Sequence, residues 1–294
     1  IALTAAVITG ALLVGDSVQY SLEQNIRLRL GNVSHALSGG ERLFTADLAE
    51  KIEKETNLPN TTLIKTTASA VASGGKYELN QIHLWGIQDD FKQITGTGFP
   101  YDSLQSNQVI LSKNTAVRLN LKVGDWVLFR IRKTGVIPAN TPFVSDEDLI
   151  ISKRYKIYKL VGEENYSRFS LEKSQQSPFN AFVDSQGLSK LMDIENKSNL
   201  ILFAENETTE KERLNTAIKK AWVLEDANLK IRKANNGRQY EIISERVFLD
   251  SVNAHAVKKA FDKPEGVLSY FVNQFKKDTA STPYSFVSGL AFTD

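Results

Sequence analysis

The sequence has no cysteine among its 294 residues. This absence excludes thiol catalysis, zinc–thiolate sites, disulfides and a lipidated N-terminal cysteine. The sequence also lacks an excess of charge of one sign, because 36 Lys and Arg stand against 34 Asp and Glu, giving a net charge of +2. Nucleic acid is therefore not expected as a partner, since domains that bind it usually carry a strongly basic face.

Motifs that bind phosphate or metal are missing as well. No G-x-x-x-x-G-K-[ST] occurs, so the chain does not itself hold ATP in a P-loop. The segment GTGFP lacks the glycine spacing of a dinucleotide loop. The run Asp146-Glu147-Asp148 is typical of a solvated loop, because three adjacent carboxylates cannot all point at one ion. We therefore expect no cofactor, no metal and no catalytic residue.

The segment ALLVGDSVQYSL allows two interpretations of Gly15-Asp16-Ser17. In the first, Ser17 is a nucleophile after a buried strand, as in GDS-type (SGNH) hydrolases, and it needs a histidine base and oxyanion donors. The three histidines fit this poorly, because His35 and His83 lie in predicted strands and His255 follows Asp250 by five residues rather than in a D-x-x-H element. No G-x-N-D element occurs, so the hydrolase is a remote alternative.

In the second interpretation, the same segment is where the chain leaves a membrane. The first 15 residues carry no charge, but a full span needs about 20 apolar residues. No basic start of a secretory signal is visible. Residues 1–15 are thus predicted to be the end of a transmembrane helix. After Asp16, apolar residues recur every four positions up to Leu30, which predicts a helix that ends at Gly31 and continues the apolar run.

The rest of the sequence shows a repeated layout of strand, helix, strand and hairpin strand, at residues 33–87 and again at 199–243. Helices are expected over residues 42–56 and from residue 245, the latter capped by Ser244. One such unit cannot bury both its sheet and its helix, so strands from both copies are expected in one sheet or in two facing sheets. These strands are 33–38, 63–72, 200–204 and 227–233.

Aromatic residues suggest where the cores lie. Trp85, Trp126 and Trp222 are spread over the chain and are expected to anchor three local cores. The segment LSYFVNQF, residues 268–275, is aromatic and rich in β-formers. We interpret it as a core strand, with an edge that faces a partner as the alternative.

Several segments together resemble the ABC transporter permeases of the FtsX-like/MacB type. ALLVGDSVQYSLEQNIRLRLG resembles their membrane-exit segment, and VILSKNTAVRLNLKVGDWVLFRI their recurring strand, short helix, Gly-Asp turn and strand. SPFNAFVDSQGLSKLM and SNLILFAENETTEKERLNTAIKKAW are similar to the strand-and-helix pairs that follow. LSYFVNQF and TPYSFVSGL resemble a branch with long extracytoplasmic regions. The resemblance covers most of the chain and depends on the order of these segments.

The resemblance implies an α+β fold with a porter-like subdomain of two β-α-β units and an inserted, strand-rich sabre-like subdomain, preceded by a transmembrane and stalk helix. The implied divisions are a transmembrane end, a stalk helix, the first porter-like half, the sabre-like insertion and the second porter-like half. In the same order they cover residues 1–15, 16–31, 32–88, 89–198 and 199–294.

The implied function is non-catalytic. Such a domain lies in the periplasm, outside the bacterial inner membrane, and couples cytoplasmic ATP hydrolysis to export, lipoprotein release or activation of a partner by mechanotransmission. The implied partners are an ABC ATPase subunit, a second permease copy or paralogue, membrane lipid around the N-terminal helix, and a periplasmic partner or substrate. The alternatives are a membrane-anchored periplasmic binding or adaptor module and, remotely, the hydrolase that uses Ser17.

Overall fold

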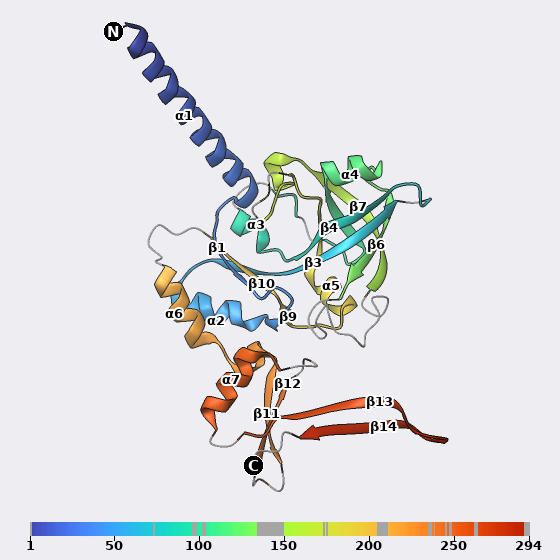
Figure 1. The fold of residues 1–294 in the computed structure, drawn as a ribbon. Coiled ribbons are helices and arrows are strands. Elements are labelled where there is room, and N and C mark those ends of the chain that lie inside the picture. Colours follow the sequence, from blue (N-terminus) through green and yellow to red (C-terminus); the bar gives the residue numbers. More distant parts are fainter. Residues whose placement is uncertain are drawn as a thin grey trace. The chain divides into compact units, whose positions relative to one another are not determined.

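The computed structural model forms two compact units, Ile1–Val247 and Phe248–Asp294, which are called unit 1 and unit 2 and are described separately (Figure 1). It describes residues 2–290 with gaps in short segments. The gaps are residues 73, 96–98, 102–103, 134–149, 173, 175, 205–210, 235–236, 238, 245, 247–248 and 262–263. The acidic run Asp146-Glu147-Asp148 lies outside the described residues.

Unit 1 begins with one continuous helix, α1 (Ala2–Leu30), which confirms the predicted fusion of the apolar run with the amphipathic segment. Its side chains are exposed over most of its length, with Leu12 at 64% and Leu22 at 58% of their full exposure. The helix is long and apolar enough to cross a membrane, with a mean hydropathy of 1.4 in its most apolar window. In Figure 1 it extends away from the rest of unit 1.

The body of unit 1 is built on an eight-stranded mixed sheet. In spatial order its strands are β1 (Val33–Ser38), β10 (Leu200–Ala204), β3 (Asn60–Ala72), β4 (Glu78–Ile87), β8 (Asn180–Asp184), β5 (Gln108–Ser112), β7 (Ile150–Val161) and β6 (Trp126–Arg132). β3 is long enough to pair with β10 at its start and with β6 at its end, so the strands from β3 to β6 close into a barrel. The pairs β4–β8 and β5–β7 are parallel, and the others are antiparallel.

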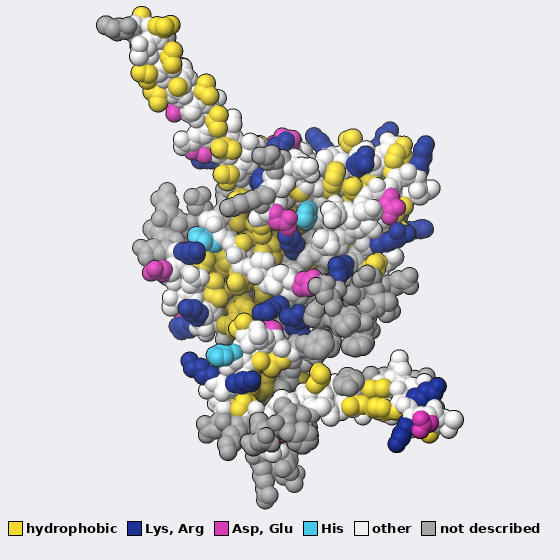
Figure 2. All heavy atoms as spheres, in the orientation of Figure 1, with side chains coloured by type: hydrophobic (Ala, Val, Ile, Leu, Met, Phe, Trp, Pro, Cys, Tyr) yellow, Lys and Arg dark blue, Asp and Glu magenta, His cyan; other side chains and the backbone are white. Residues whose placement is uncertain are grey.

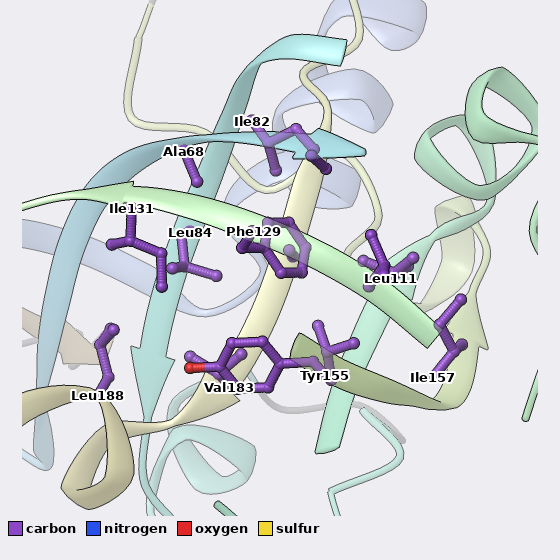
Figure 3. Close-up of a cluster of buried hydrophobic side chains, with 14 of the residues drawn as sticks. Ala68, Ile82, Leu84, Leu111, Phe129, Ile131, Tyr155, Ile157, Val183 and Leu188 are labelled. Carbon is purple, nitrogen blue, oxygen red and sulfur yellow. The ribbon is translucent and has the colours of Figure 1, made fainter. Parts of the chain in front are cut away.

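The barrel is filled by apolar side chains from all of its strands. Leu84, Phe129 and Val183 point toward one another in its interior (Figure 3). Two short helices contribute to this core, α4 (Lys113–Leu119) with Leu119 and α5 (Ser185–Leu191) with Leu188. Burial of this kind stabilises a fold by about 25 cal/mol per Å² of apolar surface, so this core holds the barrel closed.

A second layer covers the sheet where β1, β10 and β3 lie. The helices α2 (Asp47–Thr56) and α6 (Lys211–Ala221) bury Leu48, Ile52 and Leu214 against Ile201 and Phe203 of β10. β10 lies between β1 and β3, which confirms that strands more than a hundred residues apart share a sheet.

Some predicted elements are wrong in their bounds or their partners. The helix predicted from residue 42 begins at Asp47, because Phe44–Thr45 form a short strand, β2, that pairs with β9 (Lys197–Ser198). The strand predicted at 227–233 is β11 (Leu229–Ala234), which among the described residues pairs only with β12 (Gln239–Ser244). It cannot join the sheet beside β3, because β10, β4 and β6 occupy both sides of that strand.

The tryptophans also differ from the prediction. Trp85 is 1% exposed and lies in the core, whereas Trp126 and Trp222 are 44% and 40% exposed. The Trp222 ring lies 6.5 Å from that of the buried Phe44, so it packs at the edge of a core rather than inside one. Trp126 occupies an outward position on its strand, and Trp222 follows the last residue of α6.

Unit 2 contains α7 (Ser251–Ala260) and a hairpin of β13 (Val267–Lys277) and β14 (Ala280–Leu290). The helix predicted from residue 245 begins later, because the Asp250 carboxylate caps it by accepting the backbone N–H of Asn253 at 2.9 Å. The prediction of a core strand at 268–275 is wrong. Leu268 and Phe275 are each 48% exposed, since a two-stranded sheet cannot bury a face by itself.

Candidate functional site at the base of the N-terminal helix

The end of α1 packs directly against the body of unit 1. Gly31 ends the helix with φ of +57°, a left-handed conformation that favours glycine. Its Cα faces the ring of Tyr166, which follows the short 3₁₀ helix η2 (Glu163–Asn165). A Cβ on Gly31 would overlap the Tyr166 hydroxyl and would lie 2.5 Å from its Cζ. Tyr166 is buried and donates a hydrogen bond to the carbonyl of Thr95, so it has little room to move.

Polar contacts attach the last turn of α1 to the same region. The guanidinium of Arg29 donates to the backbone carbonyl of Glu172 and, at 3.3 Å, to that of Ser174. One turn earlier, Asn25 Oδ1 accepts from Arg168 Nη1 at 3.5 Å, and Arg168 forms an ion pair of 2.5 Å with Glu163. The helix therefore contacts the body at Tyr166, Arg168, Glu172 and Ser174. We call residues 166–172 and 174 the junction segment.

The junction segment is tied in turn to β3. Lys65 Nζ lies 2.8 Å from the Glu172 carboxylate and 5.6 Å from the centre of the Trp85 ring. The hydrogen bond and charge of Lys65 hold the pKa of Glu172 below its ordinary value. Glu172 is more than half exposed, so solvent screens this pair and its contribution to stability is small.

Asn180, the first residue of β8, connects the junction segment to the barrel. It is fully buried, and its Nδ2 donates to the carbonyls of Ser167 and Phe169, both at 2.9 Å. Its Oδ1 accepts the indole N–H of Trp85 at 2.9 Å. All of the polar capacity of this amide except one lone pair is thus used within the core, which fixes the junction segment against two barrel strands.

Aromatic packing reinforces that connection. Phe169 meets Trp85 edge-on with ring centres 4.7 Å apart, and Phe91 meets Phe169 at 5.8 Å. Phe91 belongs to α3 (Phe91–Thr95), whose Thr95 carbonyl accepts from Tyr166. The same buried cluster includes residues from β1, β3, β10 and the barrel, so one continuous core underlies the junction.

A histidine lies beside this core. His83 of β4 has its ring centre 6.2 Å from that of Trp85, and its Nδ1 is buried without a hydrogen-bond partner among the described residues. Burial lowers the pKa of His83 from its ordinary value, against the opposing effect of the Glu172 charge. The neutral ring is therefore the form that the folded state favours.

The structure does not assemble a hydrolase site around Ser17. Ser17 lies in the middle of the exposed helix α1, and in the described part of the chain no hydrogen bond joins it to a histidine. His35 bonds the neighbouring Ser34 at 3.1 Å on β1, His83 lies on β4, and His255 lies on α7 of unit 2. The described residues also contain no group of three or more His, Asp or Glu side chains that could hold a metal ion.

Sequence reasoning did not find the junction. Tyr166, Glu172 and Asn180 belong to no motif, and their roles depend on contacts with residues that lie far away in the sequence. The one local signal is Gly31, which predicts the end of the helix, but no pattern in the sequence indicates its contact with Tyr166.

Comparison with known proteins gives similar structures but no family. No family model matches the chain, and no curated protein matches it. The crystal structure of the periplasmic region of MacB from Actinobacillus actinomycetemcomitans is similar to it, with a TM-score of 0.42, 12% identity, and coverage of 80% of this chain and 95% of that one. The extracellular domain of the noncanonic ABC-type transporter YknZ from Gram-positive bacteria has a TM-score of 0.38, 12% identity, and coverage of 69% and 90%.

The first of these structures is a region of MacB, which the sequence resemblance also names, and the second is a domain of an ABC-type transporter. Their similarity to this chain concerns the mixed fold, and the function proposed below rests on the residues of the chain itself.

Proposed function

We propose that this chain is the extracytoplasmic part of an ABC transporter permease of the FtsX-like/MacB type, and that it transmits motion from the membrane to a domain outside it. The observation that carries the proposal is α1. Its first 13 residues, Ala2–Val14, carry no charge, its side chains are exposed, and its last turn is fixed to a buried core. A helix that is apolar on all sides and unburied in the protein fits a lipid environment.

The proposed role requires three partners: an ATPase, a second permease chain and membrane lipid. An ABC ATPase subunit supplies the motion from the cytoplasm, and a second permease copy or paralogue completes the transporter. The apolar half of α1 contacts membrane lipid of the bacterial inner membrane, and the body of unit 1 lies outside it. Within the body, the division at residues 88/89 and 198/199 into porter-like and sabre-like parts stays a prediction.

The proposed coupling runs through the junction segment. Residues 16–30 rise about 22 Å as an α-helix, enough to hold the body away from a membrane surface. A tilt of α1 acts on the body through Gly31, Arg29 and Tyr166. Because Asn180 and Phe169 bind the junction segment to the barrel, the barrel then moves with the helix. No catalytic group is needed for this role, since ATP is hydrolysed on another subunit or domain.

The test is to break α1 between the membrane and the junction. Leu22→Pro removes a backbone hydrogen bond and costs the helix about 3 kcal/mol or more. The body should still fold, because its core lies after residue 31. The chain has no cysteine, so a single cysteine at Ser152 on the barrel gives one spin label per protomer. In the reconstituted permease–ATPase complex, the label-to-label distance should change with nucleotide in the wild type and not in Leu22→Pro.

Leu22→Ala is the matched control, because it removes the same side chain but keeps the helix, and it should behave as the wild type. The alternative function is a membrane-anchored binding or adaptor module, for which α1 is only a tether. A distance that is independent of nucleotide in the wild type, with an active ATPase, would favour that alternative and reject transmission.

A further inference from the structure

The outward face of β6 and β7 carries charge of one sign. The two strands contain six Lys and Arg residues and no Asp or Glu, in a chain whose charges are otherwise nearly balanced. In Figure 2, Lys and Arg side chains gather over the side of unit 1 that these strands form. The cations are Arg130 and Arg132 of β6 and Lys153, Arg154, Lys156 and Lys159 of β7.

Strand pairing places four of these cations side by side on the outside of the barrel. Side chains alternate along a strand, and Phe129 and Tyr155 point into the barrel core. Four cross-strand pairs of β6 and β7 therefore point outward. They are Trp126 with Lys156, Leu128 with Arg154, Arg130 with Ser152, and Arg132 with Ile150. We call this face the basic strip, and it consists of these eight residues.

Among the described residues, Arg130 is the one cation of the basic strip with an anionic partner. Arg130 forms an ion pair of 3.4 Å with Glu78, and both side chains are about half exposed. No ion pair to Arg132, Arg154 or Lys156 occurs among the residues that the structure describes. A face with several such cations attracts anionic groups and accelerates their association.

An apolar groove adjoins the basic strip. It has a volume of about 430 Å³ and is lined by the apolar side chains of Trp126, Leu128 and Val71, with Arg154 at the same site. Gly74 and Gly75 of the β3–β4 turn also line the groove and add no side chain to fill it. A ligand for this site therefore needs both negative charge and an apolar group.

We propose that the basic strip and its groove bind an acidic segment of a partner protein, with carboxylates on Arg132, Arg154 and Lys156 and an apolar side chain in the groove beside Trp126. Charge complementarity favours an acidic ligand, and the groove favours a peptide that carries apolar side chains among its carboxylates. The headgroups of the protein's own membrane are a poorer fit, because residues 16–30 of α1 hold the body about 22 Å from the membrane surface.

This inference deepens the proposed function, on which it rests for the location of the partner outside the membrane. The binding itself is measured without ATPase or nucleotide. Failure of the binding test therefore leaves the transmission proposal untouched, and loss of nucleotide-driven motion leaves the binding proposal untouched.

The probe is a fluorescein-labelled peptide in which Glu and Leu alternate, titrated against the full chain in detergent micelles by fluorescence anisotropy. The same peptide with Gln in place of Glu should bind at least about tenfold more weakly. Arg154→Glu with Lys156→Glu should weaken binding of the Glu peptide by at least about tenfold, and the milder Arg154→Gln with Lys156→Gln by less. Trp126→Ala should weaken binding at high salt, where the charges are screened.

The matched control is Lys211→Glu with Arg213→Glu, which makes the same charge change on exposed residues of α6. This helix packs on the layer of β1 and β10 and lies outside the barrel. The control variant should leave the affinity unchanged. An equal loss in this control would overturn the proposal, because attraction by net charge would explain the binding. Absence of peptide binding would also overturn it, as would strip-dependent binding to phosphatidylglycerol vesicles but not to the peptide.

Discussion

Replacing Gly31 by alanine tests whether the contact between α1 and the junction segment contributes to the stability of unit 1. Two features of Gly31 disfavour an added methyl group. Its φ of +57° strains any residue with a Cβ, and that Cβ would overlap the buried ring of Tyr166, with 2.5 Å to Cζ and 2.6 Å to Cε1. Tyr166 must move to relieve the overlap, and its hydrogen bond to the Thr95 carbonyl is then lost.

The expected loss in the free energy of unfolding is the sum of the backbone strain and the lost hydrogen bond. A non-glycine residue in the left-handed region costs about 1–2 kcal/mol. A lost buried hydrogen bond costs about 1 kcal/mol more, and further if the Thr95 carbonyl finds no new partner. Gly31→Ala should therefore lower the free energy of unfolding of unit 1 by about 2–3 kcal/mol. The effect should be smaller when Tyr166 is shortened to leucine beforehand, because the overlap is then absent.

Two other glycines allow the backbone strain and the Tyr166 contact to be measured separately. Gly40 has φ of +63° but nothing within 4 Å of an added Cβ, so Gly40→Ala should cost only the backbone strain. Gly15 has neither feature, so Gly15→Ala should be neutral or slightly stabilising by helix propensity. Urea unfolding followed by tryptophan fluorescence reports unit 1, since all three tryptophans lie in it. Equal losses for Gly31→Ala and Gly40→Ala would refute the role of the Tyr166 contact.

Three further predictions concern buried polar groups. Asn180→Ala should cost about 3 kcal/mol or more in urea unfolding, because it leaves the Trp85 indole and two carbonyls without partners. The pKa of His83 is lowered in the folded state, so the unfolded state binds more protons below about pH 6.5, and stability should fall as the pH falls through that range. His83→Gln should reduce this loss when unfolding midpoints at about pH 5.5 and about pH 7.5 are compared. Asp226→Ala should lower the free energy of unfolding by about 2–4 kcal/mol in the same assay. The buried carboxylate accepts hydrogen bonds from the hydroxyl and backbone N–H of Thr45 and from the backbone N–H of Val223, and all three donors lose their partner.

Elements whose signals are local were predictable from the sequence. The single helix up to Gly31, the hairpin of β3 and β4, and the order strand, helix, turn and strand over 109–133 all follow from periodicity and turn residues, and the structure confirms them. The mixed helix and sheet fold and the sharing of a sheet by β1, β3 and β10 are confirmed as well. Each of these features depends either on a pattern within one segment or on the need of one β-α-β element to bury its apolar face against the other.

Features that depend on competition between distant segments were not predictable. β11 has the composition of a sheet strand, but the positions beside β3 are taken by other strands. Closure of the barrel depends on the length of β3, which carries it past β10 to β6. The junction was missed for a similar reason, since a buried asparagine and tyrosine become recognisable only when the segments that bind them are in place.

The way α1 is attached decides how a motion of the helix can spread. The helix is connected covalently to β1 through Gly31 and Asn32, and non-covalently to the barrel side through Arg29 and the junction segment. If these two attachments could slide past each other, a tilt of α1 would shear the sheet. They cannot do so easily, because one buried cluster contains residues of β1 and β10 together with Tyr166, Phe169 and Trp85. Interiors of this kind are close-packed and deform little. A tilt of α1 is therefore expected to move the barrel and the β1–β10 layer together, which carries the basic strip along as part of one rigid body.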